Sequence, residues 1–329
     1  MNRLWTLLKK NWFLCGIACA VVLALLVPAV GVVLNRGGAL STAAVVAIFV
    51  LSGLALPSEE MRRGLRNVRV HAFCQLFIFG AVPAYFALTS GWLLGETGAP
   101  LLWGIYALAV FPTTISSCIV LTQMARGSVA TTIFNAVLAN LLGVLVSPLL
   151  LTLLLRRAGH ALLAEDVARI FLGLVAKVLV PFLAGQVLRL RLRAFAAAHR
   201  GRLSAAGGVL VLVVVFLAFC RAAGSDALRG AAPRLVWPLA YLAGSNVVLM
   251  AAAYAAARGL RFAPGDVTAA VFVAPQKTLA MGVPLLSTYF AAQPEVLGIA
   301  MIPLLFYHPW QLLTAGVAKG FLTLPEPAP

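Results

Sequence analysis

Charged side chains are scarce in this chain, since Asp, Glu, Lys and Arg together make up 10% of its 329 residues. Soluble domains carry about 25% charged residues, so the composition argues against a soluble protein. Hydrophobic residues make up 62% of the chain, which is typical of a protein that crosses a membrane several times. The net charge is +16, but the basic residues lie in short clusters between apolar runs. We therefore expect a lipid bilayer around the chain and no nucleic-acid partner.

Motifs for redox, metal or enzymatic chemistry are also missing. The five cysteines form no C-x-x-C pair, and the four histidines show no metal-ligand spacing with them. We interpret the cysteines as small packing residues and expect no disulfide framework and no resident cofactor. The apolar runs contain no H-E-x-x-H motif, no Ser/His/Asp set and no paired acids, so we expect that the chain is not an enzyme.

Apolar residues fall into ten runs, most of them long enough to cross a hydrocarbon core of roughly 30 Å as a helix. The runs are long and continuous, unlike the short alternating segments of a transmembrane β-barrel. We predict an all-α membrane protein with ten transmembrane helices, at 12–34, 40–57, 70–94, 100–124, 128–155, 166–190, 203–223, 233–258, 264–290 and 294–320.

Basic residues divide unequally between the two sides that ten spans define, with sixteen on one side and seven on the other. Lys and Arg are enriched in cytoplasmic loops, so the split predicts an integral protein of the plasma (inner) membrane with both termini in the cytoplasm. The basic stretch "MNRLWTLLKKNWF" lacks a small-residue cleavage site, and we interpret it as leading into a first span. Lys177 and Lys277 alone lie inside spans, and Lys177 either lies near the inner wall of its span or snorkels.

The two halves of the chain share a pattern of prolines. Pro112 and Pro275 are 163 residues apart, and each follows an apolar half-span and opens a short polar stretch. Pro148 and Pro309 each lie late in the last span of their half. Five spans per half is an odd number, so the second repeat must be inverted across the membrane. We predict a single transmembrane unit made of two inverted five-helix repeats, 12–155 and 166–320.

The two interrupted spans predict a site. A proline removes one helical hydrogen bond, and the freed backbone groups cannot face lipid, although an ion, water or solute can satisfy them. Paired broken helices are typical of secondary transporters, whereas a proline that only kinks its span is the alternative. The polar residues at and near the breaks either line an ion and solute site or bond to their own and neighbouring helices. These candidates are Gln75, Thr113, Thr114, Ser116, Ser117, Thr132, Asn135, Gln276, Lys277 and Thr278.

Four segments carry a resemblance to a known family: "FVLSGLALPSEEMRRGLRN", "FCQLFIFGAVP", "FPTTISSCIVLTQMARGSVATTIFNAVLANLLG" and "PQKTLAMGVP". As a set they resemble the bile acid:sodium symporter family in its SBF-like branch, over nearly the whole chain. The resemblance implies a panel domain and a core domain, with the fourth and ninth spans as broken, crossing helices in the core. It also implies alternating access and transport of a small organic, anionic solute.

Coupling ions follow from the same resemblance. It places one possible sodium ion at Ser116, Ser117, Thr132 and Asn135, and a second at Gln75 and Gln276. The bile-acid type carries a glutamate at the position of Phe272 and an asparagine at that of Lys277. An acidic ligand is therefore missing from this chain and a fixed cation is present, which puts two-sodium coupling in doubt.

Lys277 lies near the middle of the ninth run. Burying a charge there costs several kcal/mol, so an ionisable side chain in a span indicates a function. The alternative is that it snorkels to an interface. We hypothesise that Lys277 is a tethered cation standing where sodium would bind, held by Ser116, Ser117, Thr132, Asn135 and Gln276. It would either release a proton during the cycle, so that protons are the coupling ions, or attract an anionic solute. The SBF-like branch also allows a second interpretation, a membrane regulator of calcium entry without solute transport of its own.

Overall fold

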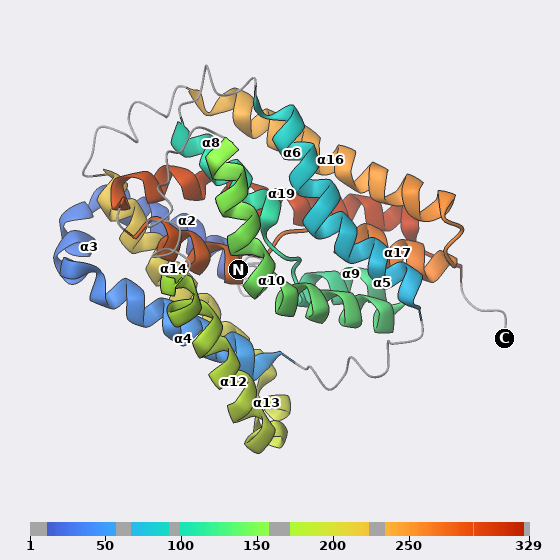
Figure 1. Cartoon of the computed structure of the whole chain (residues 1–329), viewed down its shortest axis with the longest axis horizontal. Coiled ribbons are helices and arrows are strands. Elements are labelled where there is room, and N and C mark those ends of the chain that lie inside the picture. Colours follow the sequence, from blue (N-terminus) through green and yellow to red (C-terminus); the bar gives the residue numbers. More distant parts are fainter. Residues whose placement is uncertain are drawn as a thin grey trace, which may run out of the picture. The chain divides into compact units, whose positions relative to one another are not determined.

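The computed structural model describes residues 12–56, 67–91, 99–157, 172–223, 234–291 and 293–325, and every regular element within these ranges is a helix (Figure 1). Seven helical stretches are long and apolar enough to cross a membrane, or eight if one bent pair counts as a span. This confirms the all-helical membrane fold. The ten-span count and the inverted repeats stay predictions, and the chain termini and the start of the sixth predicted span lie outside the described residues.

The chain divides into two compact units, and each takes segments from both halves of the sequence. The units therefore do not coincide with the two predicted repeats. We call them the first unit (1–56, 162–235 and 280–305) and the second unit (57–161, 236–279 and 306–329).

In the first unit, one long helix packs against helices from the other half of the chain: α4 contacts α12 and α14, and α14 also contacts α2 and α3. Most of α18 and the start of α19 belong to this unit as well. The bounds are α2 (Trp12–Leu26), α3 (Pro28–Leu34), α4 (Ala39–Ala55), α12 (Val180–Arg191), α13 (Arg193–Ala198), α14 (Arg200–Ala223), α18 (Leu279–Tyr289) and α19 (Pro294–Leu322).

The first predicted span, 12–34, is not one straight helix. It bends by 95° between α2 and α3, at Val27. Pro28 is the first residue of α3, a position that suits a ring without an N–H but does not allow α2 to continue through it. Residues 12–34 are therefore a bent pair of helices, whose count as one span stays a prediction, and the signal for the bend was the proline within "LLVPAVG".

In the second unit, α17 packs against α5, α9, α10 and α16, and α8 packs against α6 and α10. Pro148 and Pro309 lie inside α10 and α19 without interrupting either helix. The remaining bounds are α5 (Val68–Leu76), α6 (Val82–Thr89), α8 (Ala99–Val110), α9 (Ser116–Met124), α10 (Val129–Arg157), α16 (Val236–Gly259) and α17 (Pro264–Val273).

Two spans contain a five-residue π-helical segment, η3 (Phe77–Ala81) and η5 (Val175–Leu179). A proline lies two residues after each segment, Pro83 and Pro181. Because proline has no N–H and its ring displaces the carbonyl four residues earlier, the preceding turn widens by one residue rather than breaking. Such segments carry no periodicity signal, and the sequence did not predict them.

Candidate functional site

The fourth and ninth predicted spans are interrupted where the prolines predicted. Helix α8 ends at Val110 and α9 begins at Ser116, while α17 ends at Val273 and α18 begins at Leu279. The backbone N–H of Thr278 donates to the carbonyl of Pro112 over 2.9 Å, so the two breaks touch. All of these contacts belong to the second unit, whose helices α8, α9 and α17 are labelled in Figure 1.

The first break frees five consecutive carbonyls, and each of them has a donor from elsewhere in the unit. The Nζ of Lys277 binds the carbonyls of residues 109 and 111, and Thr278 N binds that of residue 112. From α10, Ser147 Oγ donates to Val110 O over 2.7 Å and Asn140 Nδ2 donates to Thr113 O over 2.9 Å. The carbonyls at the end of a half-helix inside a membrane protein need hydrogen-bond donors from the protein, because the hydrocarbon core contains no water to donate to them.

Lys277 is fully buried. Its Nζ donates to Ala109 O at 2.8 Å, Phe111 O at 2.9 Å and Ile78 O at 3.2 Å, so all three N–H groups of the ammonium are used. Two of these carbonyls lie at the C-terminal end of α8, where the helix dipole is negative, and the third lies in the π segment η3. Two of the carbonyls that bind Lys277 thus lie at the break of the fourth predicted span, whereas the lysine itself lies at the break of the ninth.

The predicted hydroxyl and amide partners of Lys277 are not the ones that bind it. Its ammonium contacts backbone carbonyls only, whereas Ser116, Ser117, Thr132, Asn135 and Gln276 make other contacts or face outward. That part of the hypothesis is corrected. The reason is geometric: carbonyls freed by the first break already meet the lysine, so no side chain is needed there.

Gln276 joins the two breaks through its side chain. Its Oε1 accepts from Thr114 Oγ1 at 2.9 Å, from Cys118 Sγ at 3.3 Å and from Ser117 Oγ at 3.4 Å. Thr114 and Ser117 also hydrogen-bond each other. The Nε2 of Gln276 is buried and has no hydrogen-bond partner among the described residues. A buried amide donor left open in this way points to a missing acceptor.

A second amide pair lies between α5 and α10. Gln75 Nε2 donates to both Asn135 Oδ1 and Asn135 O at 3.2 Å, and Asn135 Nδ2 contacts His71 Nδ1 at 3.0 Å. Asn135 Nδ2 also donates to the carbonyl of Thr131 at 2.9 Å. Within the described part of the chain, Gln75 Oε1 is buried without a partner. An open oxygen acceptor suits a cation or a donor group of a solute.

The four residues predicted for the first sodium ion have separate surroundings. Thr132 Oγ1 bonds Thr122 Oγ1 at 2.9 Å, Asn135 pairs with Gln75, and Ser117 belongs with Gln276. The side chain of Ser116 is exposed. The other candidates at the breaks, Thr113 and Thr278, are buried. Sodium binding at these positions stays a prediction.

One acid lies close to the pair of Gln75 and Asn135, through Thr131. Asp266, in the first turn of α17, is only 9% exposed. It accepts from Thr131 Oγ1 at 2.6 Å and from Asn67 Nδ2 at 2.7 Å. A carboxylate at a helix N-terminus is stabilised by the dipole and by these two donors. Asp266 therefore lies at a helix end and is buried there.

A family model describes almost the whole chain. The model of the SBF-like CPA transporter family matches residues 11–322. This chain belongs to the SBF-like CPA transporter family. The resemblance carried by its sequence segments is therefore confirmed.

Relatives of this SBF-like chain support the same assignment. Sodium/bile acid cotransporter 7-B of Xenopus laevis is 30% identical over 324 residues, which cover 94% of this chain and 91% of the relative. Sodium/bile acid cotransporter 7 of Mus musculus is 29% identical over 327 residues, with 96% and 93% covered. The putative symporter YfeH of Escherichia coli K12 is 28% identical over 310 residues, with 93% and 90% covered.

Family membership establishes the general class of this SBF-like protein. It is an integral membrane protein of a transporter family, which implies a small solute as its substrate and a lipid bilayer as its surroundings. A transporter family also implies that the chain is not an enzyme.

Several residues of the SBF-like site were not predicted. Ser147 satisfies the end of α8, and Gln311 holds the backbone of Lys277 from both sides, accepting from its N at 2.8 Å and donating to its O at 2.7 Å. His308 Nδ1 contacts Gln311 Nε2 at 3.0 Å. The available signal was a glutamine two residues after the "YHP" of the last span, but a lone glutamine in an apolar run does not reveal its partner.

Proposed function

We propose that this SBF-like protein is a secondary active transporter of a small organic anion. It works by alternating access around the two broken helices, with Lys277 as a tethered cation in the place of a sodium ion. The observation that carries the proposal is the shell of three carbonyl oxygens around the Lys277 ammonium. Oxygen ligands of this kind also hold sodium in proteins, and half-helix ends are where transporters place coupling ions.

The charge of Lys277 acts through space rather than through a free hydrogen bond. All three of its N–H groups are engaged with neutral oxygens, and no acid contacts it among the described residues. Its positive charge is therefore spread over the end of α8 without an opposing ion. In a low-dielectric interior such a charge favours an anion nearby.

Gln276 offers the solute a hydrogen-bond donor, which Lys277 does not. Its buried Nε2 has no acceptor within the described structure, and it lies one residue before the lysine. A carboxylate or sulfonate oxygen of the solute is the acceptor that fits an open amide donor beside a cation. Gln75 Oε1, also buried and open, fits a hydroxyl donor of the same solute or a coupling ion.

Reconstitution tests the proposal. Proteoliposomes that contain the protein should take up labelled organic anions, from a panel that includes taurocholate and simple mono- and dicarboxylates. Lys277→Ala should lose uptake or its coupling to a sodium or proton gradient, because the cation in the carbonyl shell is gone. Lys319→Ala, which removes a lysine near the end of α19, is the matched control and should keep both.

Sodium itself supplies the second readout. If Lys277 occupies the place of the ion, sodium should raise the unfolding temperature of the wild-type protein only weakly over potassium. Strong, saturable stabilisation by sodium, together with unchanged uptake by Lys277→Ala, would overturn the tethered-cation role. A folded, reconstituted protein that moves no anion of the panel would favour the regulator of calcium entry instead.

A further inference from the structure

The first unit contains a cavity that the proposed transport site does not use. Its volume is about 450 Å³, within the range of small-molecule sites, and several segments of the unit contribute polar side chains to its lining. We propose that this cavity binds an oxyanion, a carboxylate or phosphate group, through Lys177 and Arg221. The side chains that carry the argument are those of Asn35, Ser41, Lys177, Arg221 and Thr288.

Two cations line the cavity. Asp and Glu are absent from the lining among the described residues, and Lys177 has no hydrogen-bond partner within the same part of the chain. Two like charges on one small cavity repel each other, and an anion bound between them relieves that repulsion. Arg221 uses one N–H on the carbonyl of Asn35, at 3.1 Å, which leaves other donors of its guanidinium for a ligand.

Lys177 is placed by an unusual backbone. It lies in the middle of the π segment η5, inside an apolar span, where a solvated surface lysine would not be expected. A π segment turns its side chains away from the regular helical faces, and such segments occur often at functional sites. An ionisable side chain within a span is by default a functional group. Here it lines a cavity with other polar side chains.

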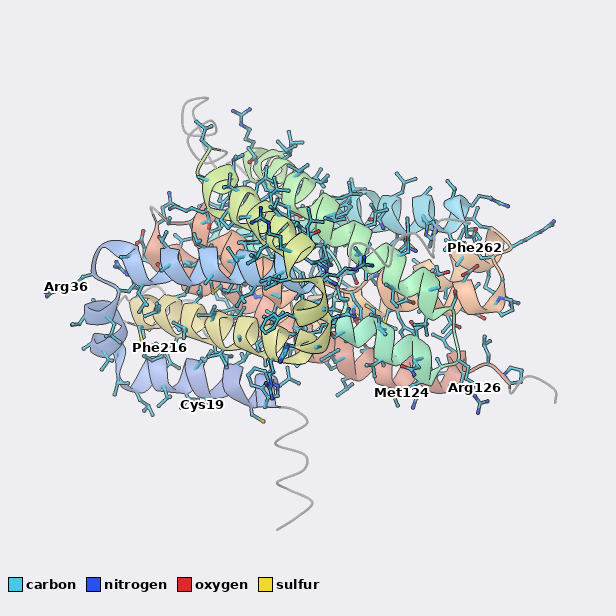
Figure 2. All side chains as sticks on the ribbon, turned by 90° about the horizontal axis from the view of Figure 1, so that it is seen from below. Cys19, Arg36, Met124, Arg126, Phe216 and Phe262 are labelled. Carbon is cyan, nitrogen blue, oxygen red and sulfur yellow. The ribbon has the colours of Figure 1, made fainter. Side chains whose placement is uncertain are left out.

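One part of the lining is the turn at residues 35–41. It joins α3 to α4 through Gly37 and Gly38, which both have positive φ, and Figure 2 labels its first residue, Arg36. Asn35 locks the turn, because its Oδ1 accepts from Ser41 N at 3.0 Å and its Nδ2 donates to Ser41 Oγ at 3.2 Å. A Cβ added at Gly37 would meet no atom within 4 Å, so the space beside the turn is open. The site is therefore preorganised, which lowers the cost of binding.

Hydroxyls complete the lining. Thr288 Oγ1 donates to Pro284 O at 3.0 Å and Ser287 Oγ donates to Val283 O at 2.9 Å. Their single protons are thus committed to their own helix. Specificity for an anion must come from the cationic side, because a committed hydroxyl offers a ligand only its oxygen. The two cations are then the groups to alter.

The test uses the purified full chain in a neutral detergent. Inorganic phosphate and succinate are titrated at constant ionic strength against chloride, and the unfolding temperature is followed. Wild-type protein should show a saturable rise with one or both. Lys177→Gln should weaken the apparent affinity by about tenfold or more, since a charge-assisted hydrogen bond is lost.

Two variants guard against a trivial result. Lys177→Arg keeps the charge and should keep most of the affinity, which a merely misfolded site would not. Arg191→Gln removes one exposed charge from the following helix and should leave the affinity unchanged. Equal stabilisation of wild type and Lys177→Gln would overturn the proposal, as would the absence of any saturable effect over chloride.

A parallel titration with phosphatidylglycerol in mixed micelles identifies the source of the oxyanion. Stabilisation by the lipid that also depends on Lys177, with little effect of free phosphate or succinate, assigns the cavity to a lipid headgroup. The reverse result assigns it to a soluble anion. Both titrations measure binding to the full chain and depend on Lys177 in the cavity of the first unit. A failure of the anion-uptake test at Lys277 is therefore distinguishable from a failure of anion binding in this cavity.

Discussion

The backbone N–H of Thr278 donates to the carbonyl of Pro112 over 2.9 Å, so each break in the second unit completes the other. Lys277, the preceding residue, adds two more bonds to the same half-helix end. One short segment after α17 therefore satisfies much of the end of α8. A substitution at either break should therefore destabilise both breaks, because they share hydrogen-bond donors and acceptors.

Ser147 provides the simplest stability test of this arrangement. It is buried, and its Oγ donates to the carbonyl of Val110 at 2.7 Å. Ser147→Ala should lower the free energy of unfolding by about 1–3 kcal/mol, because it leaves a buried carbonyl without a donor. Denaturant unfolding of the purified variant measures the loss. Thr152→Ala is the control: Thr152 lies on the same helix and bonds only its own turn, at Pro148 O, so the loss there should be smaller.

Alanine variants of the two adjacent serines at the start of α9 should differ in their effect on anion uptake. Ser117 Oγ lies 3.4 Å from Gln276 Oε1, whereas the side chain of Ser116 is exposed. We expect Ser117→Ala to lower anion uptake severalfold, because the hydroxyl helps to hold the amide that we propose as the solute contact. Uptake by Ser116→Ala should stay close to that of the wild type. The reverse order of the two variants would show that Gln276 is not the contact and would return Ser116 to the ion site.

Much of the fold was predictable, since long apolar runs leave few alternatives to membrane helices and proline with polar neighbours marks a break. Proline alone does not decide the outcome, however. Pro112 and Pro275 lie in breaks, Pro28 starts α3 directly after the 95° bend, and Pro148 lies within an unbroken helix. At the Pro112 break, donors from other segments bind the freed carbonyls, and single-sequence patterns do not show such donors.

The site was predicted less completely than the fold. The choice of Lys277, Gln276 and Thr114 rested on polar residues at a break, and the structure brings these residues close together. The partners of Lys277 were missed because they are backbone carbonyls, which every residue carries and no sequence pattern marks. The π segments were missed for a similar reason, since a single added residue shifts the carbonyl of Ile78 without altering the apolar composition.

Membrane topology is a separate prediction. The predicted ten spans and the excess of Lys and Arg on one side predict that both termini lie in the cytoplasm. A phosphatase reporter fused after Pro329 should stay inactive, and a cytoplasmic fluorescent reporter at the same position should fold. An active external reporter would remove one span from the count. The bent pair α2 and α3 would then be the first candidate for a segment that enters without crossing.

In the first unit, α4 and α12 approach so closely that only glycine fits between them. A Cβ at Gly53 would lie 2.2 Å from Phe182 O, and one at Gly185 would lie 2.2 Å from Val50 O. The obstacles are backbone atoms, which cannot move aside as a side-chain end can. Small residues at such a crossing let membrane helices pack backbone to backbone.

Gly53→Ala or Gly185→Ala should therefore force the two helices apart and cost about 1–3 kcal/mol of stability. Because both glycines belong to one contact, the double variant should cost less than the sum of the two single variants. Gly201→Ala is the control, since no atom lies within 4 Å of an added Cβ there and alanine favours a helix. Thermal unfolding of the four purified variants measures these differences. Full additivity in the double variant would mean that the helices do not share one close approach.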